Sequence, residues 1–463
     1  MGIRNNYRLK IANYRFIRNR IKFIFLFIFV LLSYYSYSQP VKIGVALPLF
    51  EGSEDISKKQ LGNEILNGLK FALNDFTKST NIKVSLEVMD TQRDPKQAFE
   101  IITGFGEDSS ISCVIGPIFS SELLECSELG EKFSIPVISP TATGDKLATE
   151  HLFTYQLNPT YEVRGKLMAE YLVKRLGMKN FAVIYEEHYG INFYDHFSEQ
   201  VYKLGGKIVS GNLYPKSITN IGEIIGSIFK VIKENDLFIK PANLNLVQRQ
   251  KLESAGVRYS LMDSLINSKL DVSIYYMLGK NAKKVFDTLN VKPYKLKPEV
   301  NKFIQGYIDA IYIPVSNPSE ISVIVPQLFS DGLSFFIAGT GDWNNEQILE
   351  ENKVYIKNLI FESEYYPDST KEDYIELVKK LKKSKYKISK NFLFGYDAMN
   401  LILKQVEDGA RTRADFNNAL LKVLNYEAIK SKISLDYYRV NSELNILRYN
   451  EGVEPVETYK LNK

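Results

Sequence analysis

The stretch Ile111–Thr143, ISCVIGPIFSSELLECSELGEKFSIPVISPTAT, constrains the fold most strongly. It contains two β-branched runs, Ser112–Ile115 and Val137–Ser139, and each stops at a Gly-Pro or Ser-Pro pair, as a buried parallel strand does. A helical segment with a Ser-Ser start joins the two runs, and a Thr-Ala-Thr turn follows the second. The pattern predicts a strand–helix–strand unit of an open α/β sheet, whose ligands bind at the carboxyl ends of the strands.

Hydroxyl side chains stand in both turns that follow these strands. Ser120 and Thr143 can cap the helices that begin there. Alternatively, the hydroxyls and the two helix N-termini form a pocket for a small anion or carboxylate. The sequence leaves both interpretations open.

The same alternation of strand and helix continues on both sides of this stretch. Strands are predicted at 41–47, 82–89, 181–185, 207–214, 309–315 and 334–340, and helices at 56–76, 95–105, 163–176, 191–204, 319–329, 371–383, 392–406 and 414–423. Such alternation is typical of doubly wound parallel sheets. A fresh start of the pattern after the extended segment Leu152–Leu157 predicts a second lobe, and Asn358–Tyr366 and Ser431–Asp436 are further extended crossings.

The segment Ser217–Val300 does not follow this alternation. It is lysine-rich, contains three prolines, and has helical patterns at Ile224–Ile232 and Leu261–Leu270. Since connections between strand and helix are usually short, we expect a mainly helical subdomain inserted into the second lobe.

The first 38 residues have the pattern of a secretory signal peptide. Seven basic residues with no acidic residue precede the apolar run Phe23–Leu32, and Ser36-Tyr37-Ser38 supplies small residues for cleavage. The run is too short to span a bilayer, which takes about 20 residues, although a retained anchor is an alternative. Without the seven basic residues, 52 Lys and Arg face 54 Asp and Glu, a net charge of −2 instead of +5. The apparent basicity is thus no indication of nucleic-acid binding.

The only cysteines, Cys113 and Cys126, are predicted to lie in a strand and in the helix packed on it. A strand and a covering helix are about 10 Å apart, which is too far for a disulfide. We expect two buried thiols. Because no cysteine directly follows the signal segment, none can carry a lipid there, and we expect a soluble product.

Catalytic and cofactor motifs are not found in the sequence. The three histidines have no metal-ligand spacing, and no phosphate-binding glycine loop or Gly-x-Ser-x-Gly motif occurs. A hydrolase that uses His188 as a base is the enzyme alternative, but we expect a protein that is not an enzyme and has neither cofactor nor metal.

Six motifs in order resemble the leucine-binding-protein branch of the type I periplasmic binding proteins, the substrate-binding family of ABC transporters. They are KIGVALPLF (42–50), Asp90 with Asp94-Pro95 and Ala98, VIGPIFSS (114–121), IPVISPTAT (135–143), FAVIYEEHYG (181–190) and FGYDAM (394–399). In addition, DAIYIPVSNPSEISVIVPQL and GTGDWNN (339–345) resemble the penicillin-binding-protein activators, which share the fold and regulate cell-wall synthases.

The resemblance implies two lobes joined by a hinge, which close over a ligand. Lobe one would comprise 39–156 and 365–430, and lobe two 157–364 and 431–463, with the insertion at 217–300. By family position, Ser121 and Thr143 would bind a ligand carboxylate with Ser120 assisting, and the backbone of Thr141 and Ala142 would add an N–H and a carbonyl.

In lobe two, the resemblance implies two ligand contacts. Tyr189 would lay its ring against the ligand, and Asp342 would face the ligand ammonium. Trp343 is either a pocket wall or a core residue.

The resemblance therefore implies a monomeric periplasmic protein, not lipid-anchored, that captures an amino acid or similar small carboxylate-bearing ligand and presents it to a membrane ABC permease. The alternative is a cell-envelope regulator that contacts a cell-wall synthase.

Overall fold

The computed structural model describes residues 40–235, 238–255, 257, 262, 266–267, 272–273, 289–294, 308–330, 336–435 and 438–461. The chain divides into two compact units. Unit 1 comprises 1–158, 370–428 and 433–441, and unit 2 comprises 159–369, 429–432 and 442–463. The segments 157–158, 365–369, 429–430 and 433–441 therefore lie in the opposite units from those predicted for the lobes. The predicted signal segment and most of the predicted helix at 261–270 lie outside the described residues.

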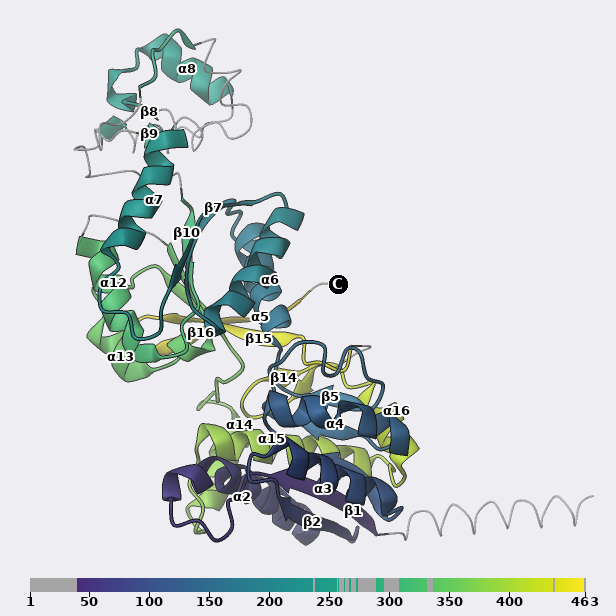
Figure 1. Cartoon of the computed structure of the whole chain (residues 1–463). Helices are drawn as coiled ribbons and strands as arrows, with labels where there is room; N and C mark the ends of the chain where they lie inside the picture. The colour runs from purple at the N-terminus through teal and green to yellow at the C-terminus, as the bar shows by residue number, and fades with distance from the viewer. Residues whose placement is uncertain are drawn as a thin grey trace, which may run out of the picture. The chain divides into compact units, whose positions relative to one another are not determined.

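Unit 1 is a doubly wound parallel sheet, as the sequence predicts (Figure 1). Its described strands have the order β2-β1-β3-β4-β5. β1 pairs in parallel with β2 and, with one shift of register between Lys42 and Ile43, with β3. The strands are β1 (Val41–Leu47), β2 (Val84–Asp90), β3 (Ile111–Ile115), β4 (Val137–Ser139) and β5 (Thr154–Gln156). The helices are α2 (Ile56–Ser79), α3 (Pro95–Glu107), α4 (Ser120–Phe133), α14 (Glu372–Leu381), α15 (Lys390–Glu407) and α16 (Arg413–Leu420).

Apolar side chains on the two faces of this sheet form two separate cores. One core joins β1 to α2 and α15, and the other joins β3 to α3 and α4. Cys113 on β3 and Cys126 on α4 are both fully buried free thiols. Burial raises the pKa of Cys126 to about 12 and that of Cys113 further, so both thiols stay protonated.

Unit 2 contains a seven-stranded sheet among the described residues, with the order β16-β15-β12-β11-β10-β6-β7. The parallel strands are β6 (Asn180–Glu186), β7 (Lys207–Tyr214), β10 (Ala310–Ile313), β11 (Phe336–Gly339) and β12 (Leu359–Ser363). The last two strands, β15 (Glu443–Tyr449) and β16 (Val453–Lys460), are antiparallel to β12 and to each other. A three-residue turn joins β15 to β16, and so short a link permits only an antiparallel pair.

The helices of unit 2 cover both faces of this sheet (Figure 1). One face packs on α5 (Tyr161–Glu170) and α6 (Tyr189–Lys203), and the other on α7 (Gly222–Asn235), α12 (Ile321–Ser330) and α13 (Glu346–Glu351). The predicted helix 163–176 is interrupted, since α5 continues as a π-helical turn, Tyr171–Arg175. Short pieces complete the element list: 3-10 turns Pro318–Glu320 and Gly341–Trp343, and a pair of β13 (Tyr426–Glu427) and β14 (Lys432–Ile433).

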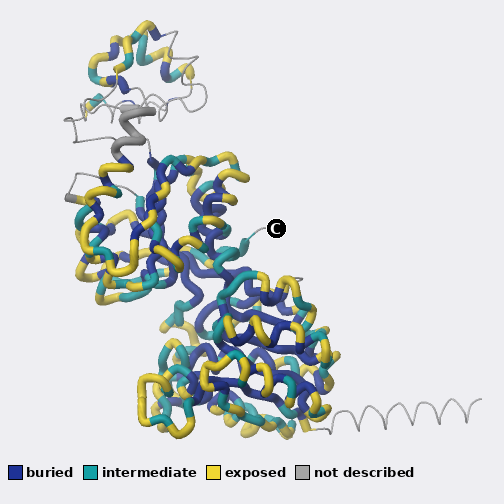
Figure 2. Tube along the Cα trace, viewed as in Figure 1, coloured by how far each residue is buried: buried dark blue, intermediate teal, exposed yellow. Residues whose placement is uncertain are grey.

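The inserted segment has a small core of its own. Its described elements are β8 (Phe238–Ile239), a 3-10 turn (Pro241–Asn243), α8 (Leu246–Ser254) and β9 (Val272–Ser273). A separate cluster of buried residues holds them together: Ile239, Leu244, Leu252, Val257, Met262 and Leu289. Figure 2 shows buried strands at the centre of each unit and exposed residues on the outer helices.

Candidate functional site

The first turn of the candidate site in unit 1 follows β3 and leads into α4. The residue before α4, Phe119, is extended and makes no side-chain cap. The hydroxyl of Ser120 instead accepts hydrogen bonds from the backbone N–H groups of Gly144 (2.9 Å) and Thr143 (3.3 Å). Ser120 therefore does not cap α4, which was one of the two interpretations that the sequence left open. Its hydroxyl connects the turn after β3 to the turn after β4 and so brings the two hydroxyl-bearing turns together.

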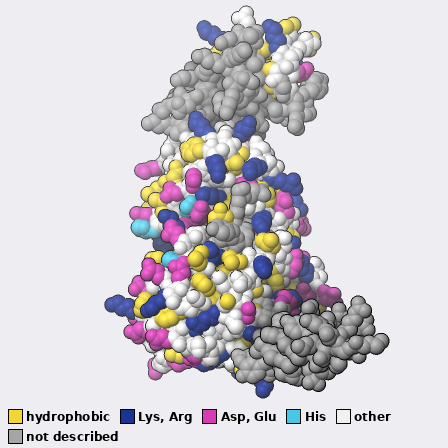
Figure 3. All heavy atoms as spheres, turned by 90° about the vertical axis from the view of Figure 1, so that its right-hand side faces the viewer, with side chains coloured by type: hydrophobic (Ala, Val, Ile, Leu, Met, Phe, Trp, Pro, Cys, Tyr) yellow, Lys and Arg dark blue, Asp and Glu magenta, His cyan; other side chains and the backbone are white. Residues whose placement is uncertain are grey.

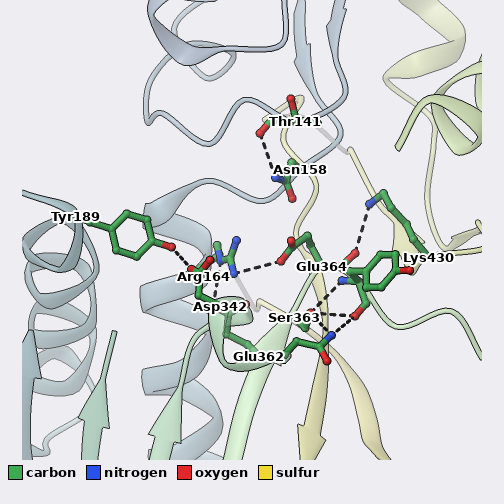
Figure 4. Close-up of polar contacts among 11 residues, drawn as sticks. Thr141, Asn158, Arg164, Tyr189, Asp342, Glu362, Ser363, Glu364 and Lys430 are labelled. Carbon is green, nitrogen blue, oxygen red and sulfur yellow. Dashed lines mark hydrogen bonds and ion pairs between the residues drawn. The ribbon is translucent and has the colours of Figure 1, made fainter. Parts of the chain in front are cut away.

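Several groups of the second turn already have partners within unit 1. The Thr141 hydroxyl donates to the Ile118 carbonyl at 2.7 Å, and the Thr141 carbonyl accepts from the Asn158 amide at 3.1 Å (Figure 4). Ala142 is 2% exposed; its N–H donates to the Ser139 hydroxyl, and its carbonyl accepts from the Gln156 amide. These contacts fix the shape of the turn, and they leave Ala142 little capacity to bind a ligand.

The hydroxyls of Ser121 and Thr143 have no hydrogen-bond partner among the described residues. Ser121 lies exposed in the first turn of α4, and Thr143 is half-buried. Because no side chain caps α4, its first-turn N–H groups also lack a side-chain acceptor. Two hydroxyl donors at the positive end of a helix dipole suit a carboxylate or another small anion.

Sequence reasoning missed Glu122, the third residue of α4. Its side chain is fully buried, and interactions with the Thr91 side chain and the Phe119 backbone lower the pKa of its carboxyl less than burial raises it. Burial raises the pKa of this carboxyl, which favours the neutral acid. A neutral Glu122 does not repel an anion at the N-terminus of α4. Nearby, the Arg93 guanidinium lies over the Phe119 ring at 4.3 Å and adds positive charge to the same end of the helix.

In unit 2, the two predicted ligand residues lie together at the carboxyl ends of the parallel strands. Tyr189 is the first residue of α6, after β6, and Asp342 lies in the 3-10 turn after β11. The Tyr189 hydroxyl donates a hydrogen bond to the Asp342 carboxylate (Figure 4). Burial and the Asp342 charge raise the pKa of Tyr189 well above its ordinary value, so the phenol stays protonated and remains a donor.

A buried ion cluster that the sequence analysis did not identify surrounds this pair (Figure 4). Arg164 on α5 is 5% exposed, and its Nε lies 3.0 Å from Glu362 Oε1 on β12 while its Nη2 lies 3.2 Å from Glu364 Oε2. Desolvation lowers the pKa of Arg164, but the two glutamates outweigh it and raise the pKa well above the ordinary value. Burial raises the pKa of Glu362 to about 8, against the lowering effect of Arg164. Asp342 and Tyr189 also interact electrostatically with Arg164, so the cluster and the predicted ligand residues form one electrostatic unit.

Gly341 permits this arrangement because the ion pair passes directly over its backbone. A Cβ at this position would lie 2.4 Å from Arg164 Nη2 and 2.6 Å from Glu364 Oε2. The GTGD sequence therefore needs glycine immediately before Asp342, and only a residue without a side chain leaves room for the ion pair.

The other two residues considered in the sequence analysis, Trp343 and His188, lie in the core and on the surface. Trp343 is fully buried and its indole N–H donates to the Ile313 carbonyl at 2.8 Å, which makes it a core residue of unit 2 and not a pocket wall. The His188 side chain is 92% exposed, so no buried environment tunes it as a base. In the described part of the chain, no group of three or more His, Cys, Asp or Glu side chains is arranged to hold a metal ion. Among the helices described, none combines the length and apolarity needed to cross a membrane.

The surface carries charges of both signs. On the face shown in Figure 3, Lys and Arg side chains lie interspersed with Asp and Glu side chains. This agrees with the near balance of 52 basic and 54 acidic residues after residue 38.

Comparisons with known proteins agree with this architecture. Residues 64–247 match the receptor family ligand binding region. An amino acid binding protein from Pseudomonas aeruginosa is 26% identical over 174 residues, which are 36% of this chain and 45% of that protein. The chain spans less than half the length of the curated relatives it matches.

Solved structures match over almost their whole length. A leucine binding protein from Thermotoga maritima (17% identity, TM-score 0.53) covers 91% of this chain and 99% of its own. A putative branched-chain amino acid ABC transporter protein from Rhodospirillum rubrum (15% identity, TM-score 0.65) covers 90% and 99%. The chain therefore has the fold of these solute-binding proteins, the type I periplasmic binding protein fold.

Proposed function

We propose that this chain is an extracytoplasmic solute-binding protein that captures an amino acid or similar small carboxylate-bearing ligand and presents it to the permease of an ABC transporter. The signal-like segment at 1–38 supports export, and the family is one of ligand-binding proteins, which argues against an enzyme. The single observation that carries the ligand class is the uncapped N-terminus of α4, with the unpartnered hydroxyls of Ser121 and Thr143 beside it.

In this proposal the ligand carboxylate binds to unit 1. Ser121 and Thr143 donate hydroxyl hydrogen bonds to it, and the first-turn N–H groups of α4 add their dipole. Ser120 acts indirectly, because its hydroxyl holds the Thr143–Gly144 backbone in place. Of the predicted backbone contacts, the Thr141 N–H is retained in the proposal, and Ala142 is assigned to the support of the turn.

Unit 2 contributes the recognition of positive charge in the same proposal. Asp342 faces the ligand ammonium and Tyr189 keeps its carboxylate oriented through their hydrogen bond. A desolvated ammonium needs an anionic partner, and the cluster around Asp342 contains more carboxylates than cations.

Titration calorimetry tests the ligand class. The mature chain (39–463) is titrated with the common amino acids, and binding of one or more is expected. A hydrogen bond to a charged group contributes about 1.5–3 kcal/mol, so Ser121→Ala is expected to weaken binding about 10- to 150-fold. Ser127→Ala, on the same helix with its hydroxyl bonded to the Leu124 carbonyl, is the matched control and is expected to leave affinity unchanged. No binding by any amino acid, or an equal loss in both variants, would contradict the proposal.

The second candidate function, regulation of a cell-wall synthase, was suggested by the GTGDWNN motif. Its residues are engaged in internal contacts: Trp343 is buried, Asn344 donates to the Tyr365 carbonyl, and Asn345 caps α13. The motif thus has a packing role that explains it without a synthase. Retention of a penicillin-binding protein by the immobilised mature chain, together with silence in calorimetry, would favour the regulator.

A further inference from the structure

The buried cluster of unit 2 has an imbalance of charge. Among the described residues, the cluster contains two cations, Arg164 and Lys430, and three carboxylates, Asp342, Glu362 and Glu364. Arg164 bridges the two glutamates, and Lys430, 1% exposed, lies with its Nζ 3.5 Å from the Glu364 carbonyl. A buried net charge is costly, and proteins remove it by pairing or by taking up a proton. One carboxylate of the cluster is therefore expected to hold a proton when no further cation is present.

Glu362 is the carboxylate best placed to hold that proton. Its side chain is 0% exposed, Oε1 accepts from Arg164, and Oε2 has no hydrogen-bond partner within the described chain. Burial raises the pKa of this carboxyl to about 8. The charged groups that act on Glu362 are Arg164 of α5, Asp342 of the 3-10 turn and Glu364, and Glu362 in turn acts on Tyr312 of β10. Tyr189 of α6 and Lys430 lie further out in the same cluster, next to Asp342 and to the Glu364 carbonyl.

Two buried hydroxyls, those of Tyr312 and Thr340, can form a hydrogen bond with the Glu362 carboxyl whether it is protonated or ionised. Strand register aligns Tyr312 with Ala338 and Ala338 with Ile360. Thr340 and Glu362 lie two residues further along their strands, and so on the same face as Tyr312. The Tyr312 and Thr340 hydroxyls are fully buried, and neither has a hydrogen-bond partner among the described residues. A hydroxyl accepts from a protonated carboxyl and, after rotation, donates to an ionised one.

We propose that Glu362 is the proton-exchanging positioning residue of the ligand site: it holds a proton in the ligand-free protein and releases it when a ligand brings an ammonium group to Asp342. The O–H bond at Oε2 breaks, the electron pair stays on the carboxylate, and the proton leaves to the buffer. Three cations then balance three carboxylates. This inference rests on the proposed function, and it predicts that the site distinguishes ammonium-bearing ligands from simple carboxylates by proton release.

The test is calorimetric titration of the mature chain with L-leucine and with its deaminated analogue, 4-methylpentanoate, in buffers of different ionisation enthalpy at pH 7. With a pKa of about 8 in the ligand-free protein, leucine is expected to release about 0.9 of a proton. The analogue is expected to release none. Affinity for leucine should rise up to about tenfold per pH unit between pH 6 and 7, because ligand and proton compete.

Glu362→Gln keeps the acceptor for Arg164 and removes the exchangeable proton. In this variant the proton release and the pH dependence of leucine affinity are expected to disappear while leucine still binds. The matched control is Glu170→Gln. Glu170, on α5, is also a fully buried glutamate but has its own partners, Lys174 and Gln200, so this variant should behave as the wild type.

The outcomes separate this inference from the proposed function. If leucine binds without proton release, or if Glu362→Gln releases as many protons as the wild type, Glu362 does not have the role proposed, although the solute-binding function stands. If no amino acid binds, the proposed function fails and this inference fails with it. An infrared band of a buried protonated carboxyl in the ligand-free protein, lost in Glu362→Gln, is the expected ligand-independent result, and its absence overturns the inference by itself.

Discussion

The buried carboxyl of Glu362 should make the stability of unit 2 depend on pH in a way that one substitution removes. Its pKa rises from 4.5 to about 8, mainly through burial, so between these values the folded protein binds a proton that the unfolded chain does not. The free energy of unfolding is then largest below pH 4.5 and falls as pH rises toward 8. The slope is about 1.4 kcal/mol per pH unit.

Glu362→Gln cannot ionise and is expected to lose this dependence. Relative to the wild type, the variant should gain about 2–3 kcal/mol between pH 5 and pH 7. Urea unfolding measures this, followed by the fluorescence of Trp343, which is the only tryptophan in the sequence and is buried in unit 2. The signal therefore reports the unit that contains Glu362 even if the two units unfold separately.

Glu223→Gln, an exposed change on α7 of the same unit, is the control and should follow the wild-type curve within experimental error. If the wild type and Glu362→Gln differ by the same free energy at every pH from 5 to 7, Glu362 is ionised in the folded protein. That result would refute the argument from burial.

Two further predictions concern packing in both units. Gly341→Ala should destabilise unit 2 by about 1–3 kcal/mol, because the added Cβ would lie 2.4 Å from Arg164 Nη2. The control Gly104→Ala, on α3 with no atom within 4 Å of the added carbon, should be neutral or slightly stabilising. Equal Tm shifts in the two variants would count against the collision. Cys113 and Cys126 should resist a thiol reagent in the native protein and react fully in denaturant, because both are buried with raised pKa values; rapid labelling of either thiol without denaturant would show that it is accessible.

The unit 1 fold was predictable because local patterns and tertiary packing agree there. Val41–Leu47 is apolar and β-branched, ends at a proline, and forms β1 over the predicted residues. In unit 2 the parallel strands were equally visible. The antiparallel direction of β15 and β16 follows from the three-residue link Asn450-Glu451-Gly452, a hairpin signal that the sequence analysis left unused. The π-helical turn at Tyr171–Arg175 also lies inside a run with ordinary helical periodicity.

The candidate site was only half predictable from sequence. Tyr189 and Asp342 each follow a parallel strand of the same sheet. Because the carboxyl ends of parallel strands lie at one edge of the sheet, the predicted topology already places the two residues on the same side. Arg164 and Glu362 are 198 positions apart, and no local pattern reports that a helix places one over the other. A signal was present nevertheless, since Glu362 directly follows the apolar residues Leu359–Phe361 within a fully buried strand. A carboxylate in a buried strand is costly unless it is paired, so its presence predicts a buried cation nearby.

The way in which the chain completes the unit 2 sheet has a consequence for its synthesis. β15 and β16 come from residues 443–460, yet β15 pairs directly with β12, which the ribosome makes about 80 residues earlier. Until these last strands emerge, β12 remains an uncovered strand edge that can pair with other chains. The nascent chain therefore exposes the strand edge of β12, with its unpaired N–H and C=O groups, while residues 364–442 are being translated. Truncation before β15 is therefore expected to leave the β12 edge uncovered and to promote aggregation.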